Sequence, residues 1–214
     1  PPRDASTLCK GTRRTMALTL SQAHSEVVAV TINDDADIAA WHHKGDITLR
    51  LIRAIASACK AEPALNAWYD NHALARILHE KVELGIAVDT EHGLFVPVLS
   101  HIEKRDAEDL RNALDEIKAA VKSRSIPLEK MRGHTITLSN FGTFAGRYAN
   151  PVIVPPTVAI LGAGKTRAQV VMIADRFESH NILPLSLTFD HRAVTGGEAT
   201  RFLAALLIDL GLPK

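Results

Sequence analysis

The spacing of hydrophobic and polar residues predicts a chain that mixes helices and strands. Apolar residues at helical spacing predict helices at residues 12–23, 48–61, 107–121 and 196–206. β-Branched or alternating stretches predict strands at residues 27–32, 81–89, 93–99, 134–138, 170–177 and 182–189, the last two as a hairpin. Residues 34–37 contain three aspartates and predict a turn or a helix start. Because strands and helices do not alternate strictly, the pattern predicts an α+β protein with a mixed or antiparallel sheet.

A histidine lies between the last predicted strand and the last predicted helix. The alternating pattern runs into Asp190, His191 and Arg192, and Gly196 then opens the helical pattern. An imidazole has an ordinary pKa near ~6.5, so it can take up and return a proton at neutral pH. His191 is therefore a candidate general base, although most of the ten histidines should be surface or core side chains.

Composition and length favour one compact domain. With 214 residues, 46% hydrophobic and 23% charged, the chain can bury a sizeable core, which we place at residues 11–214 after a linker remnant at residues 1–10. The formal charge of +1 gives no reason to expect nucleic acid or an anionic membrane as partner. No apolar run approaches the ~20 residues of a membrane span. The cysteines, Cys9 and Cys59, suggest no disulfide framework, which favours the cytoplasm of a bacterium or alternatively the mitochondrial matrix.

Two adjacent histidines could suggest a metal site, but their spacing argues against it. His42 and His43 would not share one face of a helix, and no third ligand follows at a suitable spacing. We therefore expect no metal.

Several motifs together resemble one enzyme family. DHRAVTGGEATRFL, residues 190–203, resembles the DHRxxDGxxxxRFL signature of the dihydrolipoamide acyltransferase core of 2-oxo acid dehydrogenase complexes. GIAVDTEHGLFVPV, TLSNFG and ANPVIVPPTVAILGAG resemble other segments of that family, in the same order. The last resemblance implies a strand at residues 149–164. The resemblance implies a chloramphenicol-acetyltransferase-like fold, a mixed β-sheet flanked by helices. The chain departs from the family at Thr195, where Asp or Asn is usual, and at residues 39–45, where a longer helix is usual.

The resemblance implies transfer of an acyl group, of branched-chain or pyruvate type, from acyl-dihydrolipoamide to coenzyme A. A thiol with an ordinary pKa near ~8.5 needs a base, which would be His191. Ser139 would stabilise the oxyanion, with a strand-end serine bonded to the backbone as the alternative. Thr195 would complete the catalytic group by a hydrogen bond to an arginine or to the backbone, in place of the family's acid, with reduced activity as the alternative. No GxSxG motif surrounds Ser139, which argues against a serine-hydrolase triad with Asp190.

The resemblance also assigns residues to supporting roles. Arg14, or alternatively Arg13, would pair with position 195, and Asp190 and Arg192 would brace the turn. Coenzyme A, a substrate, would contact Thr48, Asp89, Gly162 and Gly164. Thr48 and Asp89 also suit a helix start and a turn.

The family's assembly implies the partners of this chain. The resemblance implies a homotrimer with serine and histidine from neighbouring chains, and assembly of trimers into a hollow core through the C-terminal residues, here 210–214. A frayed tail is the alternative. The lipoyl group would come from a domain outside this chain, and the decarboxylase and dihydrolipoamide dehydrogenase would be partners. Two alternative functions are a catalytically impaired scaffold and a chloramphenicol-acetyltransferase-like O-acyltransferase.

Overall fold

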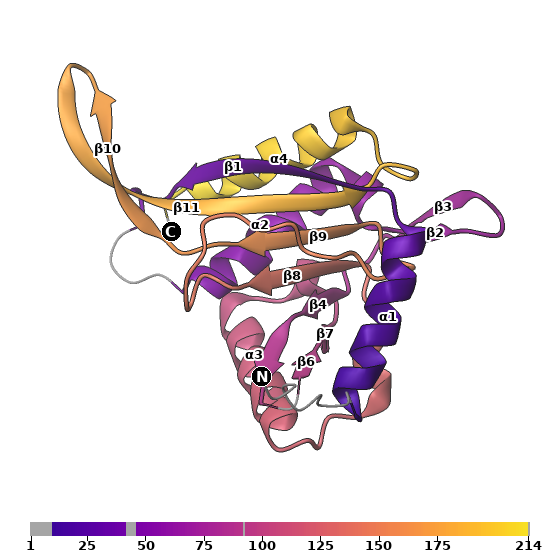
Figure 1. Ribbon diagram of the computed structural model, residues 1–214. Helices are drawn as coiled ribbons and strands as arrows, with labels where there is room; N and C mark the ends of the chain where they lie inside the picture. Colours follow the sequence, from indigo (N-terminus) through magenta and orange to yellow (C-terminus); the bar gives the residue numbers. More distant parts are fainter. Residues whose placement is uncertain (1–9, 42–45, 92, 214) are drawn as a thin grey trace, which may run out of the picture.

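The computed structural model describes residues 10–41, 46–91 and 93–213 (Figure 1). Within them lie the helices α1 (Thr12–Glu26), α2 (Ile47–Ala61), α3 (Ala107–Lys122) and α4 (Gly196–Gly211). The strands are β1 (Ala29–Asp37), β2 (Ala67–Asp70), β3 (Ala75–Leu78), β4 (Leu84–Ile86), β5 (Val88–Thr90), β6 (Gly93–Phe95), β7 (Val98–Leu99), β8 (Ile136–Asn140), β9 (Ala159–Ala163), β10 (Arg167–Ile173) and β11 (Arg176–Asp190). The four predicted helices are thereby confirmed, with small changes at their ends.

A mixed sheet forms the centre of the molecule. Its strand order is β1-β11-β9-β8-β4-β7, and β10 pairs with the outer part of β11 as a hairpin. The hairpin was predicted, but its turn is at Ala174 and Asp175, inside the strand predicted at residues 170–177, and β11 continues through residues 178–181. β8 runs parallel to β4 and β9, whereas β11 is antiparallel to both β1 and β9. Two further pairs, β2–β3 and β5–β6, form separate small sheets. The mixed sheet with flanking helices confirms the predicted fold class.

The inner part of β11, residues 182–190, is buried on both faces, with different chemistry on each. Leu185, Leu187 and Phe189 lie in the main hydrophobic core, and Figure 1 shows α2 and α4 on the same side of the sheet. On the other face Ser186 and Thr188 are equally buried, and their hydroxyls bond the Ala149 N–H (3.1 Å) and Thr31 Oγ1 (2.7 Å). Each buried hydroxyl thus has a partner, which removes most of the cost of burying it.

Several predictions for the strand regions were wrong in part. The acidic residues at 34–37 lie in β1, because β11 supplies a full set of partners from Leu185 to Ile182. The charge of Asp35 is compensated there by Arg147 and Arg167, each 2.9 Å away. The two long strands predicted at residues 81–99 are four short ones, since the chain leaves the sheet after β4 to form β5–β6. Only the end of the predicted strand at 149–164 is regular, as β9.

The end of α4 is held against α2. Arg50 is 3% exposed and donates through Nη2 to the carbonyls of Asp209 (3.1 Å) and Leu212 (2.7 Å). Trp41 Nε1 donates to the Leu210 carbonyl at 2.6 Å. A cation at a helix C-terminus also interacts favourably with the helix dipole. These contacts fix the chain as far as Leu212, which argues against a frayed tail in the part described.

No helix in residues 10–41, 46–91 and 93–213 combines the length and the apolar character needed to cross a membrane.

Candidate active site

His191 lies at the start of the turn that joins β11 to α4. Its backbone N–H donates to the Val28 carbonyl at 2.8 Å, which ties the turn to the segment between α1 and β1. Its ring packs beside that of Phe189, with centroids 5.7 Å apart. The side chain is exposed rather than enclosed in the core. An imidazole so placed can reach a ligand on the surface of the chain.

Asp190 and Arg192 fix the backbone on both sides of His191. The Asp190 side chain is buried and accepts from Arg192 Nε (3.0 Å), Arg192 Nη2 (2.6 Å) and the backbone N–H groups of Arg192 and Val28. Its carbonyl accepts from the N–H groups of Ala193 and Val194. A buried carboxylate paired in this way is costly to disturb. The contacts suit the expected bracing role, which stays a prediction.

The hydroxyl of Thr195 caps helix α4. It accepts from the Glu198 N–H at 3.3 Å, while Glu198 Oε2 accepts from the Thr195 N–H (2.8 Å) and hydroxyl (3.0 Å). This reciprocal arrangement is a capping box. The Thr–backbone hydrogen bond that we considered as a substitute for the family's acid is thus present. The catalytic assignment of Thr195 stays a prediction.

Ser139 lies near the carboxyl end of β8, beside several of the expected coenzyme A residues. It is half-buried and pairs with Gly162 on the adjacent strand β9. The next residue, Asn140, donates through Nδ2 to Thr48 Oγ1 at 3.5 Å. Thr48 itself lies in the first turn of α2, where Asp46 caps the helix by accepting from its N–H at 2.9 Å.

Asp89 lies at the same end of the sheet. The Ala87 N–H donates to the Leu138 carbonyl at 2.9 Å, and Asp89 follows two residues later as an exposed residue of β5. The fold therefore brings Asp89, Thr48 and Ser139 to one end of the sheet.

Gly162 and Gly164 are buried, and their small size has a packing reason. A Cβ on Gly164 would lie 2.1 Å from the Arg147 carbonyl oxygen, and one on Gly162 would lie 3.1 Å from the Phe141 ring. Because neither glycine has a side chain, the loop that follows β8 can pack directly against their backbone. Within one chain this loop covers them, so their expected contact with coenzyme A has no exposed surface here and stays a prediction.

The structure divides the predicted residues between two ends of the sheet. The histidine end holds Asp190, His191, Arg192 and Thr195, and the serine end holds Thr48, Asp89, Ser139, Gly162 and Gly164. Ser139 lies opposite Gly162, Gly162 lies opposite Ser186, and His191 comes five residues after Ser186. With a rise of about 3.3 Å per residue and strands about 4.8 Å apart, Ser139 and His191 are roughly 19 Å apart. One chain does not bring them together.

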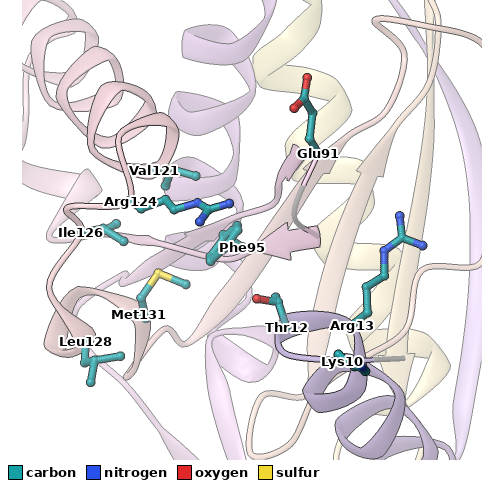
Figure 2. A pocket seen from close by; sticks show the side chains of 10 residues that line it. All are labelled: Lys10, Thr12, Arg13, Glu91, Phe95, Val121, Arg124, Ile126, Leu128 and Met131. Carbon is teal, nitrogen blue, oxygen red and sulfur yellow. The ribbon is translucent and has the colours of Figure 1, made fainter. Parts of the chain in front are cut away.

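The expected pairing of Arg14 with Thr195 is absent within the chain. Arg14 is in the first turn of α1, while the last residue of that helix, Glu26, lies near the histidine end. The helix rises about 18 Å between them. Arg13, the alternative, lines a cleft of about 630 Å³ at the same start of α1, with Lys10 and Arg124 (Figure 2).

Sequence reasoning missed the partner of the His191 turn, which is the β2–β3 hairpin. Arg76 Nη1 donates to the Ala193 carbonyl (2.8 Å) and to Glu198 Oε1 (2.9 Å). Arg192 Nη1 donates to Asn71 Oδ1 at 2.8 Å and its guanidinium lies 4.7 Å from the Tyr69 ring. The only sequence signal was the aromatic character of residues 68 and 69, because hydrogen bonds across more than a hundred residues leave no local pattern.

Metal-binding and redox features are few in the described ranges. No group of three or more His, Cys, Asp or Glu side chains there could hold a metal ion. His42 and His43 lie outside the described residues. Cys59 is a free, buried cysteine, as predicted.

Residues 2–208 match the family described as 2-oxoacid dehydrogenases acyltransferase (catalytic domain). The chain belongs to this family. A curated relative of this acyltransferase domain is the dihydrolipoyllysine-residue acetyltransferase component of the acetoin cleaving system of Bacillus subtilis (strain 168), 33% identical over 211 residues. That match covers 92% of this chain and 52% of the relative, so the chain spans about half the length of the curated relatives it matches.

Solved structures agree with this assignment. The cubic core of the pyruvate dehydrogenase multienzyme complex superimposes with a TM-score of 0.89 at 29% identity, covering 99% of this chain and 96% of that one. The same values hold for a dihydrolipoamide acetyltransferase (E2p) of Azotobacter vinelandii, studied for the role of a serine, a histidine and an asparagine in its catalytic mechanism. Chloramphenicol acetyltransferase superimposes with a TM-score of 0.57 at 12% identity over 90% of this chain and 94% of that one, which shows the shared fold.

Proposed function

We propose that the chain is the catalytic domain of a dihydrolipoamide acyltransferase, which transfers an acyl group from acyl-dihydrolipoamide to coenzyme A. The observation that carries the proposal is a match in residue spacing. In the Azotobacter vinelandii enzyme the named serine and histidine are 52 positions apart, and the asparagine follows the histidine by four. Ser139, His191 and Thr195 have the same spacing, 52 and four. These are the residues that the resemblance of their motifs to the family selects.

In this reaction His191 takes the proton from the coenzyme A thiol, and the resulting thiolate attacks the acyl carbonyl carbon. A carbon–sulfur bond forms, and the carbonyl oxygen becomes an oxyanion that accepts a hydrogen bond from the Ser139 hydroxyl. The bond from the acyl carbon to the dihydrolipoamide sulfur then breaks, and the imidazolium returns the proton to that sulfur. No covalent intermediate on the protein is needed.

The separation of the two ends supports an active site shared between copies. Because Ser139 and His191 lie roughly 19 Å apart in one chain, a thiol against His191 would meet a Ser139 hydroxyl only if another copy supplied it. A ring of copies joined head to tail places the serine end of one beside the histidine end of the next. We propose that this ring is a homotrimer, the number of copies that the family resemblance implies, and its closed symmetry gives each copy one complete site.

Larger assembly and further partners belong to the same proposal. A structural relative at 29% identity forms a cubic core in a pyruvate dehydrogenase complex, which supports a hollow core built from trimers. The decarboxylase and the dihydrolipoamide dehydrogenase would then be partners. The lipoyl group would be carried by a domain outside this chain, consistent with relatives about twice its length. We also propose that the protein is located in the cytoplasm.

The acyl group is proposed to be of pyruvate or branched-chain type, with acetyl favoured. Acetyltransferase is the activity in the name of the Bacillus subtilis relative. Turnover with acetyl, isobutyryl and succinyl donors would rank the three directly. We expect the succinyl donor to be slowest.

The test is a transfer assay with acetyl-dihydrolipoamide and coenzyme A, which measures acetyl-coenzyme A formed by the wild type and by His191→Ala. Removal of a general base typically costs 10²- to 10⁴-fold. A loss of that size in a folded, equally assembled variant supports the proposal. Equal rates for both proteins would refute it and favour the second candidate, a core that assembles without catalysis. That candidate rests on Thr195, whose hydroxyl already serves the cap of α4.

A further inference from the structure

The turn that carries His191 is attached to a single hairpin at two neighbouring points. Tyr69 on β2 and Arg76 on β3 lie directly opposite each other in the register of that hairpin. The Tyr69 ring receives the guanidinium of Arg192, which directly follows His191. Arg76 reaches the second half of the turn, at Ala193. Figure 1 shows β2–β3 extending beside the end of β11.

Arg76 makes the contacts that the local turn geometry cannot supply. The first half of the turn is closed by Asp190, whose carbonyl accepts from the N–H groups of Ala193 and Val194. The Ala193 carbonyl, in contrast, accepts from a side chain of the hairpin, Arg76 Nη1, at 2.8 Å. Hydrogen bonds from a charged donor are stronger than neutral ones, and this one fixes the orientation of a backbone group two residues from His191.

Glu198 completes the attachment from the side of α4. Its Oε1 accepts from Arg76 at 2.9 Å, and its Oε2 accepts from the Thr195 N–H at 2.8 Å. The side chains of Arg76 and Glu198 are 29% and 17% exposed, so solvent screens the pair only in part. Burial raises the pKa of Glu198, but hydrogen bonds from the Thr195 backbone and the Arg76 guanidinium outweigh it and leave the pKa below its ordinary value. Glu198 is therefore ionised at neutral pH.

We infer that Arg76 and Glu198 are positioning residues that hold the His191 turn in its reactive geometry. Neither touches the reacting atoms: Arg76 acts through the Ala193 carbonyl, and Glu198 acts through Arg76 and Thr195. The ion pair between Arg76 and Glu198 lies next to Thr195. Thr195 is uncharged and occupies the position where the family usually has Asp or Asn. The inference rests on the proposed acyl transfer, in which His191 is the base.

The variants Arg76→Met and Arg76→Lys test the inference, with Arg53→Met as matched control. Arg53 pairs with Asp209 at 3.3 Å and therefore joins α4 as Arg76 does, but at the opposite end of the helix from the turn. We expect Arg76→Met to lower kcat about 10- to 100-fold with KM for coenzyme A little changed, because a small displacement of a catalytic group has effects of this size. Arg76→Lys should recover part of kcat, and Arg53→Met should keep it.

A second readout does not depend on turnover. The rate at which diethyl pyrocarbonate modifies His191, followed by mass spectrometry of its peptide, reports the surroundings of the ring. We expect this rate to change several-fold in Arg76→Met and not in Arg53→Met. An unchanged modification rate, together with an unchanged kcat where the wild type is active, would overturn the inference. An inactive wild type with a changed modification rate would refute the proposed function and leave the positioning role supported.

Discussion

Ser139 and His191 lie at opposite ends of one sheet, separated by β9 and by five residues along β11. If copies share the active site, Ser139→Ala and His191→Ala should complement each other when co-expressed. In a mixed ring a serine from one variant meets a histidine from the other, and with equal random mixing about one quarter of the sites are intact. The measurement is the transfer rate of purified mixed assemblies, compared with each variant alone. A rate no higher than that of the better single variant contradicts a shared site.

Gly164→Ala should destabilise the chain. The added Cβ would lie 2.1 Å from the Arg147 carbonyl oxygen, so the loop after β8 must move. Overpacking of this kind typically costs about 1–3 kcal/mol, measured here as the free energy of unfolding in urea. Gly196→Ala is the control, since a Cβ there meets nothing within 4 Å. Equal stabilities of the two variants would show that the loop adapts freely.

Thr195→Ala should lower the free energy of unfolding by about 0.5–2 kcal/mol, because it removes the side chain that caps α4. Thr195→Asn should retain most of the stability, since asparagine also caps helices well. Chemical denaturation of the three proteins measures both effects. A Thr195→Ala variant as stable as the wild type would contradict a capping role.

The ion pair of His180 with Asp37 should make stability depend on pH. Asp37 Oδ2 lies 2.5 Å from His180 Nδ1, and this hydrogen bond raises the pKa of His180 above its ordinary value. The folded state then holds the proton more tightly than the unfolded state. The contribution is complete below about pH 6.5 and is lost as the pH rises through the folded-state pKa. Urea unfolding across this range should show the loss in the wild type.

Asp37→Asn tests the cause of that dependence. The substitution removes the carboxylate but keeps the size of the side chain, so the decline of stability above about pH 6.5 should shrink. If the wild type and Asp37→Asn decline equally, the pH dependence arises elsewhere in the chain.

Local patterns predicted α2, α3 and α4 well because each of these helices buries one apolar stripe. In α3 the buried residues Leu110, Leu114, Ile117 and Val121 follow the helical spacing seen in the sequence. Strand lengths were harder, since pairing partners decide them. Asp34 to Asp37 resemble a turn in isolation and become a strand because β11 lies beside them. The motifs selected His191 and Ser139 from only a few residues each.

What the sequence could not provide was the relation between distant side chains. Arg76 contacts Glu198 across 122 positions, and nothing near Arg76 distinguishes it from a solvated arginine on a hairpin. The expected pairing of Arg14 with Thr195 is absent within the chain, and it too would have been a contact between residues far apart in the sequence. The distance between Arg14 and Thr195 depends on the direction of α1 across the molecule, which no local pattern encodes.

The covered position of Cys59 has a consequence for a reaction between thiols. Its side chain is 5% exposed, and burial raises the pKa of its thiol well above the ordinary value. A protonated sulfur behind the surface is a poor nucleophile toward a thioester. In the proposed reaction, this burial keeps the Cys59 thiol from capturing the acyl group in place of coenzyme A.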